Sequence, residues 1–393
     1  MSRITVLFGV AVSLSHLALA HHGGAEWDLA KTVEFKGKLT KVDLINPHAW
    51  LYFDVTEPDG KISHHRCEMR SVHVLRRSGW TKELFPVGQQ VTIEASPNRT
   101  DPASCYLQTI LAADGTRMDR YGQYVKAPQG GVQEVRGPIS ALSVKPKTNR
   151  PLRRPTGEPN IAGDWAEVQR VMVNPRGTGG GLVPLDSLDQ YKSGAQAKAG
   201  AGKGKGAGAP KGPRLYGGSE LTEAGEKAAA DFKREDTPRF HCETTSILFD
   251  WTFDGVVDRI TQNKDTIVLE YGQFGMKRTI YMSQKEHPAN IKPSRAGHSI
   301  GHWEGDTLVV DTVGFLPGFL NTPVRNSEKL HVVERFSLDP NKMALTRAYA
   351  AEDPVYLKGK YTGSDTILVA DAPYNPGKCH ELNFIDYSKQ LKQ

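Results

Sequence analysis

The chain has 393 residues, of which 38% are hydrophobic, and this length and composition suit two or three globular domains. The formal net charge is +6, but residues 191–218 hold six basic residues and no acidic one, so a basic surface for nucleic acid is not indicated. After the first 20 residues no stretch approaches the roughly 18 apolar residues of a membrane span, and we expect none.

The first 20 residues have the pattern of a secretory signal peptide. Arg3 supplies the basic start, residues 4–12 form the apolar run, and Ala18-Leu19-Ala20 is a small-residue cleavage site. We therefore predict cleavage after Ala20 and a periplasmic or secreted location. In that location the basic segment 191–218 is a solvated linker, with weak association to an anionic cell surface as the alternative.

Cleavage after Ala20 would place two histidines at the new N-terminus, where a free amine and an imidazole together could bind copper. The predicted metal ligands are His21, His22 and His48, the last of which follows Pro47 in a turn between strands. Other histidines of the same region that could complete the site are His64, His65 and His73. The alternative is that all of these are ordinary exposed histidines.

The four cysteines suit disulfides in an oxidising compartment, where they allow three pairings. We predict the pairs Cys67–Cys105 and Cys242–Cys379, because each bond would then close one domain. Free buried thiols are the alternative.

Residues 21–124 form the first predicted domain. Strands are expected at residues 32–43, 49–55, 89–96 and 105–112, where apolar side chains alternate or cluster. A short helix is expected at 71–78, and residues 57–60 have the composition of a turn. Short strands of this kind with one helix in about 100 residues suggest a small barrel of the oligonucleotide/oligosaccharide-binding (OB) kind, and a small open sandwich is the alternative.

Residues 125–159 are rich in Pro, Lys and Arg and are predicted to be an extended connector. The second predicted domain spans residues 160–393. Its Ala/Gly/Lys-rich insertion at about 190–218 cannot build a core and is expected to be disordered. A helix is expected at residues 219–233, because Leu221, Ala224 and Ala228 share one face.

From residue 240 onward the composition is that of strand after strand. The expected strands are residues 247–253, 259–262, 266–271, 276–282, 298–303, 307–313, 330–338, 344–351 and 356–370. Eight or more antiparallel strands at this spacing predict a large up-and-down barrel of the calycin or lipocalin kind. Gly163 and Trp165 match the Gly-x-Trp signature at the first strand of such barrels. The predicted fold class is mainly β, with an OB-like barrel and a larger antiparallel barrel joined by a flexible linker.

Three segments of the first domain resemble a family of small exported bacterial domains of unknown function. They are HHG at residues 21–23, INPHAW at 45–50 and LRRSGW at 75–80, where a Ser interrupts the Arg-Arg-Gly-Trp-like pattern of the family. In the second domain, GHSIGHWEGDTLVVDTVGF at residues 297–315, preceded by His287-Pro288, resembles hypothetical exported bacterial proteins. The two resemblances imply export and a two-domain organisation, and they imply no established activity.

The segment at residues 297–315 contains the candidate catalytic residues, His298 and Asp311. If Glu304-Gly305 is a two-residue turn, these two residues lie opposite each other in a hairpin and share one face. The Asp311 carboxylate could then orient His298 as a general base. A three-residue turn would place His298 opposite Thr312 instead, and a purely structural His–Asp pair is the other alternative.

Polar residues within the expected strands of the larger barrel are candidates for a ligand site inside it. We single out Arg278, Glu334 and Arg347, since an interior Arg–Glu pair could bind a carboxylate or polar ligand, or could be a buried structural pair. The chain lacks a phosphate loop, a Gly-x-Ser-x-Gly elbow, a His-Glu-x-x-His motif and a dinucleotide fingerprint. Nucleotide chemistry and the common hydrolases are therefore disfavoured.

These patterns suggest three functions. The first is a secreted protein that binds a small, partly apolar molecule in the larger barrel. The second is an enzyme without a cofactor (a lyase, isomerase or hydrolase) that uses His298 and Asp311 for acid–base chemistry. The third is periplasmic copper binding through the N-terminal histidine.

Overall fold

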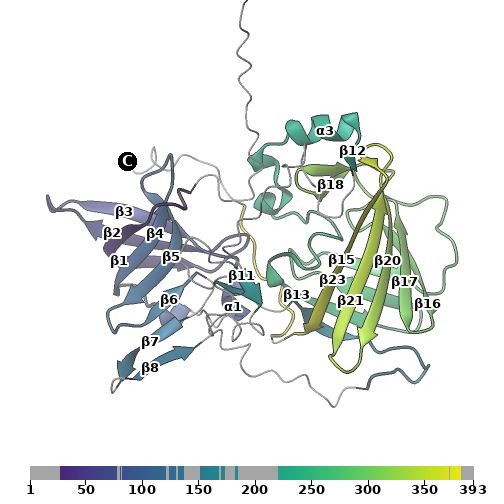
Figure 1. The fold of residues 1–393 in the computed structure, drawn as a ribbon, viewed down its shortest axis with the longest axis horizontal. Coiled ribbons are helices and arrows are strands. Elements are labelled where there is room, and N and C mark those ends of the chain that lie inside the picture. The colour runs from purple at the N-terminus through teal and green to yellow at the C-terminus, as the bar shows by residue number, and fades with distance from the viewer. Residues whose placement is uncertain are drawn as a thin grey trace, which may run out of the picture.

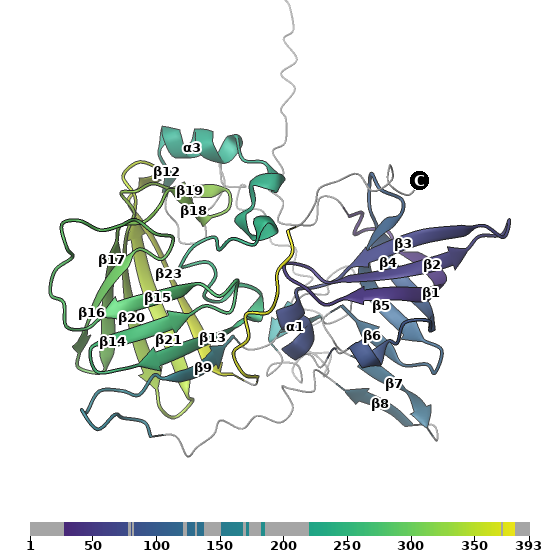
Figure 2. The same ribbon diagram turned by 180° about the vertical axis from the view of Figure 1, so that it is seen from behind.

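The computed structural model describes residues 27–77, 80, 82–120, 124–129, 132–136, 151–167, 170–172, 182–184, 220–370 and 372–381. The predicted signal peptide, its cleavage site and the basic insertion lie outside these residues. Strands dominate the described chain and form two barrels that stand side by side, as the two opposite views in Figures 1 and 2 show. The predicted fold class, mainly β with a smaller and a larger barrel, is confirmed.

The smaller barrel contains the first five strands and a helix. Its elements are β1 (Val33–Asp43), β2 (Trp50–Thr56), β3 (Ile62–Glu68), α1 (Val72–Arg77), the short 3₁₀ helix η1 (Lys82–Leu84), β4 (Gln90–Pro97) and β5 (Ser104–Ala112). The strands follow the order β3-β2-β1-β4-β5, and a parallel pairing between β3 and β5 closes the ring. Five strands with one helix between the third and fourth agree with the predicted OB-like barrel.

A disulfide lies at the seam where the smaller barrel closes. Cys67 of β3 and Cys105 of β5 are direct partners in the parallel pairing, and their sulfur atoms are bonded. Both cysteines are fully buried, together with core side chains such as Leu39 and Phe53. The predicted pairing is confirmed, and the bond fixes the register of the strand pair that makes this sheet a barrel.

Three further strands continue the sheet from β5. They are β6 (Arg117–Asp119), β7 (Tyr124–Gln129) and β8 (Val132–Arg136). All but the first residue of the β7–β8 hairpin lies within the segment 125–159, for which the sequence predicted an extended connector. Apolar residues at 132 and 135 suit a strand, but the surrounding Pro and basic residues hid this signal in the composition of the segment.

The larger barrel is closed by nine strands. In order around the ring they are β13 (Val257–Gln262), β14 (Thr266–Glu270), β15 (Lys277–Tyr281), β16 (His298–Glu304), β17 (Thr307–Val313), β20 (His331–Asp339), β21 (Ala344–Glu352), β23 (Lys360–Val369) and β9 (Gly163–Ala166). Trp165 of β9 is fully buried, and its indole N–H donates to the Ile161 carbonyl at 2.9 Å. The Gly-x-Trp segment therefore closes the ring between the last strand and β13.

The expectation that all neighbouring strands are antiparallel is wrong at one place. Strands β15 and β16 run parallel, with Ile280 opposite Ser299. A parallel pair needs a long connection, because the chain must return to the end from which it started. Residues 282–297 form this connection, and they lie outside the barrel wall (Figure 2).

Smaller elements surround the larger barrel. They are β10 (Arg170–Met172), β11 (Leu182–Pro184), β12 (Glu220–Leu221), α3 (Glu223–Ala230), η3 (Arg234–Asp236), η4 (Pro238–His241), η5 (Phe253–Gly255), β18 (Gly318–Asn321), β19 (Val324–Asn326) and β22 (Leu357–Lys358). Helix α3 is shorter than the predicted helix 219–233. It begins after Thr222, whose hydroxyl accepts the Gly225 N–H at 3.1 Å and so caps the first turn.

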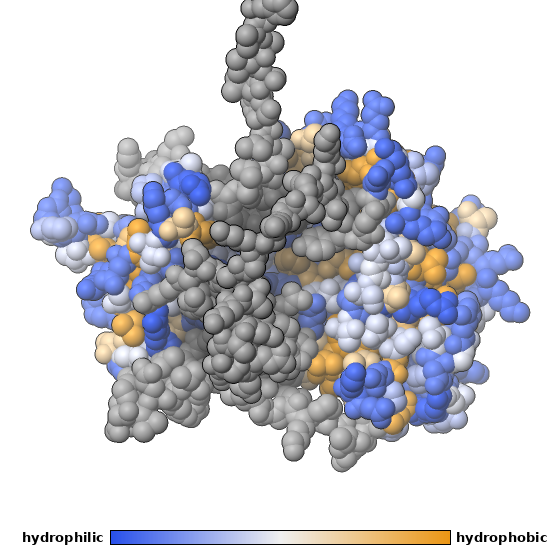
Figure 3. All heavy atoms as spheres, in the orientation of Figure 1, coloured by the Kyte–Doolittle hydropathy of each residue, from blue (hydrophilic) through white to orange (hydrophobic). Residues whose placement is uncertain are grey.

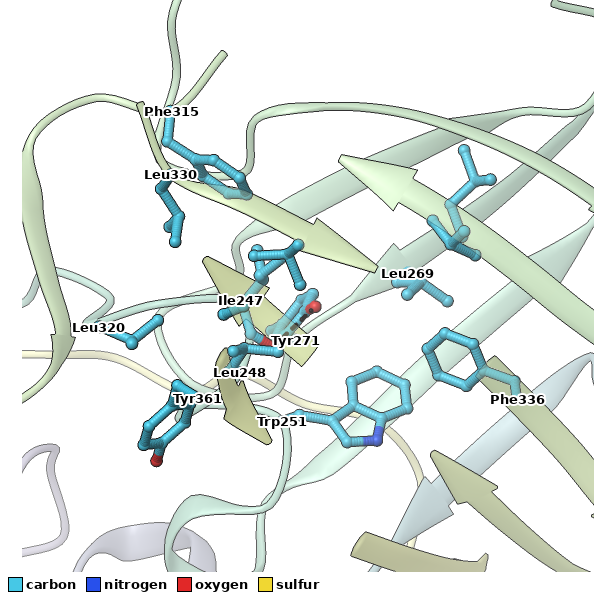
Figure 4. Close-up of a cluster of buried hydrophobic side chains, with 14 of the residues drawn as sticks. Ile247, Leu248, Trp251, Leu269, Tyr271, Phe315, Leu320, Leu330, Phe336 and Tyr361 are labelled. Carbon is cyan, nitrogen blue, oxygen red and sulfur yellow. Dashed lines mark hydrogen bonds between the residues drawn. The ribbon is translucent and has the colours of Figure 1, made fainter. Parts of the chain in front are cut away.

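The strand predicted at residues 247–253 is wrong, because this segment folds into turns. The Asp250 carboxylate accepts the N–H groups of Thr245 at 2.5 Å and of Ser246 at 2.9 Å, which bends the chain back on itself. The apolar side chains Ile247 and Trp251 then point into the core of the barrel (Figure 4). We call residues 246–251 the plug.

A buried ionic network holds the plug inside the barrel. Glu334 of β20 accepts hydrogen bonds from Arg278 of β15 and from Arg347 of β21, the latter at 3.3 Å. Arg347 also donates to the plug carbonyls of Ile247 at 2.9 Å and Leu248 at 2.8 Å. The side chains of all three ionic residues are at most 1% exposed. The ion pairs and hydrogen bonds of the network therefore take the place of the hydration that these charges have in water.

The two barrels contact each other through the turn before β2, helix α1 and the C-terminal segment. Arg77 at the end of α1 donates to the carbonyls of Gly255 at 2.6 Å and Glu167 at 2.8 Å, and Arg70 pairs with Asp254. The Asn46 backbone exchanges hydrogen bonds with residues 378 and 380 of the C-terminal segment. The disulfide Cys242–Cys379, which confirms the second predicted pair, anchors that segment to the larger barrel.

The described surface is largely polar. On the face drawn in Figure 3 the larger barrel shows hydrophilic residues with small, separate hydrophobic groups between them. Within the described ranges no helix is long and apolar enough to cross a membrane.

The network predicts a large effect of Glu334→Gln on stability. The amide would remove the carboxylate that Arg278 and Arg347 share, although Arg347 would keep its ion pair with Asp365. Breaking a buried ion pair costs about 3–5 kcal/mol. Chemical denaturation of wild type and variant measures this loss. Glu352→Gln is the matched control, since Glu352 pairs with Lys360 at the exposed end of β21 and should change the free energy of unfolding little. Equal effects of the two substitutions would contradict the role of Glu334.

The plug also predicts a pH dependence. Burial raises the pKa of the Asp250 carboxyl to about 7, although the nearby Arg239 charge and the two backbone N–H bonds oppose this shift. A raised pKa in the folded state stabilises the fold at low pH, and this contribution is lost as the pH rises from about 4 to about 7. Asp250→Asn keeps the shape without the titration. The stability of this variant relative to wild type should therefore rise across that window, by at most about 1.4 kcal/mol per pH unit. A constant difference between the two proteins would refute this prediction.

Candidate functional site

The candidate catalytic residues His298 and Asp311 lie on one face of the β16–β17 hairpin, but not opposite each other. The turn is Gly305-Asp306, so Glu304 pairs with Thr307, His298 with Val313 and Asp311 with Ile300. Both registers considered from the sequence are therefore wrong. His298 and Asp311 still share a face, which is the outer face, because the alternate residues Ser299 and Thr312 are fully buried inside the barrel.

A third residue, His287, connects the predicted pair. Its Nε2 lies 2.9 Å from Oδ1 of Asp311, and its Nδ1 lies 2.8 Å from Nδ1 of His298. His331 of β20 binds the other carboxylate oxygen, with Nε2 at 2.9 Å from Oδ2. The four side chains form one hydrogen-bonded chain, His298–His287–Asp311–His331, which we call the histidine chain.

The long connection between the parallel strands brings His287 to this place. The residue lies in the 282–297 connection, which the bridge from Ser294 to Phe315 ties back to the sheet. Gly314 and Gly297 allow the close approach, since a Cβ at either position would lie within 2.8 Å of a neighbouring atom and both have positive φ. The sequence offered one signal for His287, its place before Pro288 and just ahead of the long motif, but no spacing links it to Asp311.

The carboxylate of Asp311 determines where the protons of the chain lie. An ionised carboxylate accepts only, so His287 and His331 must each carry a proton on Nε2. The Nδ1 atom of a neutral His287 is then an acceptor, and His298 must donate from its own Nδ1. The Nε2 atom of neutral His298 is left without a proton and can accept one.

The charges of the site favour this arrangement at neutral pH. Burial alone would raise the pKa of the Asp311 carboxyl, but hydrogen bonds from His331 and His287 outweigh it and hold that pKa below the ordinary value. Burial and then the nearby His287 lower the pKa of His298. An ionised Asp311 therefore stands beside a neutral His298.

Tyr281 completes the surroundings of His298. The two rings are stacked, with centroids 5.1 Å apart and planes 18° apart. The His287 ring packs edge-on against the His298 ring, with the ring centroids 5.1 Å apart and 71° between the planes. These contacts fix the orientation of the His298 ring. The side chains of Asp311 and His331 are 38% and 41% exposed, so the chain is open to molecules from solution.

The predicted ligand residues Arg278, Glu334 and Arg347 are brought together, inside the barrel. They bind each other and the plug, and Arg278 also donates to Ser299 at 2.9 Å and Thr312 at 2.7 Å. The cavity next to the plug, lined by residues including Ser246 and Ile247, measures about 10 Å³ and has room for one water molecule.

The predicted metal ligands are not brought together in the described chain. His21 and His22 lie outside the described residues. His48 lies at the contact between the barrels, where its Nδ1 is 2.7 Å from Oε1 of Glu68 and its ring packs edge-on against Phe240. Of the other candidates, His64 and His65 belong to β3, and His73 in α1 lies 2.9 Å from Asn46 and is buried, which lowers its pKa to about 4. Among the residues that the structure describes, no group of three or more His, Cys, Asp or Glu side chains has the geometry to hold a metal ion.

Comparison with known proteins gives one similarity. A family model described as a family of unknown function (DUF6152) matches residues 10–105, which agrees with the resemblance of the first domain to a domain of unknown function. No curated protein and no solved structure matches the chain. The match covers β1 to β4 of the smaller barrel and the first two residues of β5, and it does not reach the histidine chain.

The histidine chain predicts specific tautomers. At a pH where all three imidazoles are neutral, ¹⁵N NMR should find the proton of His287 and of His331 on Nε2 and that of His298 on Nδ1. In Asp311→Asn the amide has one accepting and one donating end, so one of the two flanking histidines must move its proton to Nδ1. A proton on Nε2 of His298 in the neutral wild-type protein would contradict the arrangement.

Proposed function

We propose that the protein is an acid–base enzyme of the cell exterior in which His298 is the proton acceptor. The observation that carries this proposal is the hydrogen-bonded chain from Asp311 through His287 to His298. It leaves the Nε2 atom of His298 basic and fixes the ring by stacking on Tyr281. Reactions of this class need no cofactor, and they include proton removal from water or from a carbon acid.

The chain stabilises the charge that proton transfer creates. When His298 takes a proton on Nε2, its Nδ1–H bond to His287 strengthens, and the proton can pass along that bond. His287 then carries the positive charge with its Nε2–H directed at the Asp311 carboxylate, 2.9 Å away. A carboxylate in this position orients the imidazole and stabilises the imidazolium, as in catalytic triads.

The lower pKa of His298 suits this role. A base that is neutral at the working pH can accept a proton, and burial together with His287 keeps His298 in that state. The rate should therefore rise with pH through a value below the ordinary histidine pKa and then level off.

The other sequence-based functions have weaker support. A ligand inside the larger barrel would have to displace the plug residues Ile247, Leu248 and Trp251, which are at most 5% exposed. Copper binding by His21, His22 and His48 stays a prediction from the sequence. Export is supported by the two disulfides, which form and persist in oxidising compartments.

The test compares His298→Gln with wild type on a panel of activated esters, lactones and carbon acids, and on a bacterial periplasmic extract analysed by mass spectrometry. We expect at least one compound to be converted by wild type and its turnover to fall by roughly 10²- to 10⁴-fold in the variant. His64→Gln is the matched control, because His64 binds Asp54 at 2.6 Å on the smaller barrel and should leave turnover unchanged. Conversion that is equal in all three proteins, or absent from wild type, would refute the proposal.

A further inference from the structure

A cavity of about 240 Å³ opens at one end of the larger barrel, and it shares no residue with the histidine chain. Its walls come from the 3₁₀ helices η3 and η4, from the 282–297 connection and from the β18–β19 hairpin. The lining residues that bear on the argument are Asp236, His241, Glu243, Arg295, Phe319 and Arg325. Since cavities for drug-sized ligands start at about 300 Å³, this one suits a smaller molecule.

One wall of the cavity contains a cation–π contact between Arg325 and Phe319. Arg325 and Phe319 are direct partners across the β18–β19 hairpin, and the Arg325 guanidinium lies 4.6 Å from the centre of the Phe319 ring. A second ring, that of Phe232, packs edge-on against Phe319 at 5.5 Å and holds it in place. The ring holds the guanidinium at the cavity, and the planar guanidinium group can bind a carboxylate through two parallel N–H bonds.

Among the described residues Arg325 has no acidic partner, whereas the other charges of the cavity are engaged. Arg295 forms an ion pair with Glu243, and the Asp236 carboxylate accepts the backbone N–H of Lys233 at 3.1 Å. His241 donates from Nε2 to the Glu235 carbonyl at 2.6 Å, so its Nδ1 is free to accept a bond. Arg325 is thus the arginine of the cavity whose charge is not balanced by a described carboxylate, and its N–H groups can donate to a ligand.

We propose that this cavity binds a small carboxylate with a flat apolar body. The carboxylate would pair with the Arg325 guanidinium, and the body would lie against Phe319 and the two lining prolines, Pro238 and Pro317. The site is distinct from the proposed catalytic function, since none of its residues belongs to the histidine chain.

The experiment is a ¹H–¹⁵N NMR titration of the full mature chain with sodium benzoate as the probe and benzamide as its neutral, isosteric counterpart. We expect benzoate to shift the resonances of residues 318–326 in a saturable way and benzamide to bind far more weakly. In Arg325→Gln the affinity for benzoate should fall by roughly 10- to 100-fold, the effect of losing hydrogen bonds to a charged group.

Arg335→Gln is the matched control. It removes the same charge from the outer face of β20, where Arg335 pairs with Glu304 at 2.6 Å, and it should leave benzoate binding unchanged. Thermal unfolding of each variant establishes that the fold is intact. Three results would overturn the proposal: no saturable shift with benzoate, equal affinity for benzamide, or equal affinity in Arg325→Gln and wild type.

Discussion

The larger barrel depends on one buried carboxylate. Glu334 bridges Arg278 and Arg347 inside a ring of nine strands, and Arg347 in turn binds the backbone of the plug. Arg347 also forms an ion pair with Asp365 at 2.5 Å, so two carboxylates balance the two buried arginines. Without them the cost of desolvating each charge would be several kcal/mol even after relaxation. The network therefore decides that the barrel is filled by its own chain, with Trp251 packed edge-on against Tyr271 and Phe336.

Because the interior of the larger barrel is filled, its candidate sites lie on the outer face and at one end. The parallel pairing of β15 and β16 forces residues 282–297 to cross outside the wall, and this crossing supplies both His287 and Arg295. The histidine chain and the cavity at Arg325 thus have a common structural origin. Without the 282–297 connection, Asp311 would lose its hydrogen bond to His287 and keep the one to His331.

Two of the sequence segments that resemble a family of unknown function have a structural role in this protein. The turn at residues 45–50 and the helix at 72–77 lie where the smaller barrel meets the larger one. The Asn46 side-chain amide N–H group donates to the Pro376 carbonyl at 3.2 Å, which joins the two barrels, and the same nitrogen lies 2.9 Å from His73. The disulfide between Cys242 and Cys379 anchors to the larger barrel the C-terminal segment that Asn46 contacts.

The sequence by itself determined the class of the fold and most of its strands. Alternating apolar residues, explicit turns and the cysteine count led to two barrels and to both disulfide pairs, because these signals act over a few residues or depend on compartment.

Tertiary structure decided what rests on contacts between distant segments. The register of β16 and β17 depends on which two residues form the turn. Gly305 and Asp306 form it, with a φ of 59° at Gly305, so His298 pairs with Val313, two residues beyond the predicted partner Asp311. Residues 247–253 look like a strand by composition, but Asp250 turns them into the plug. His287 and Arg325 gain their proposed roles only from neighbours 24 and 6 residues away, at Asp311 and Phe319, and no local pattern records such a contact.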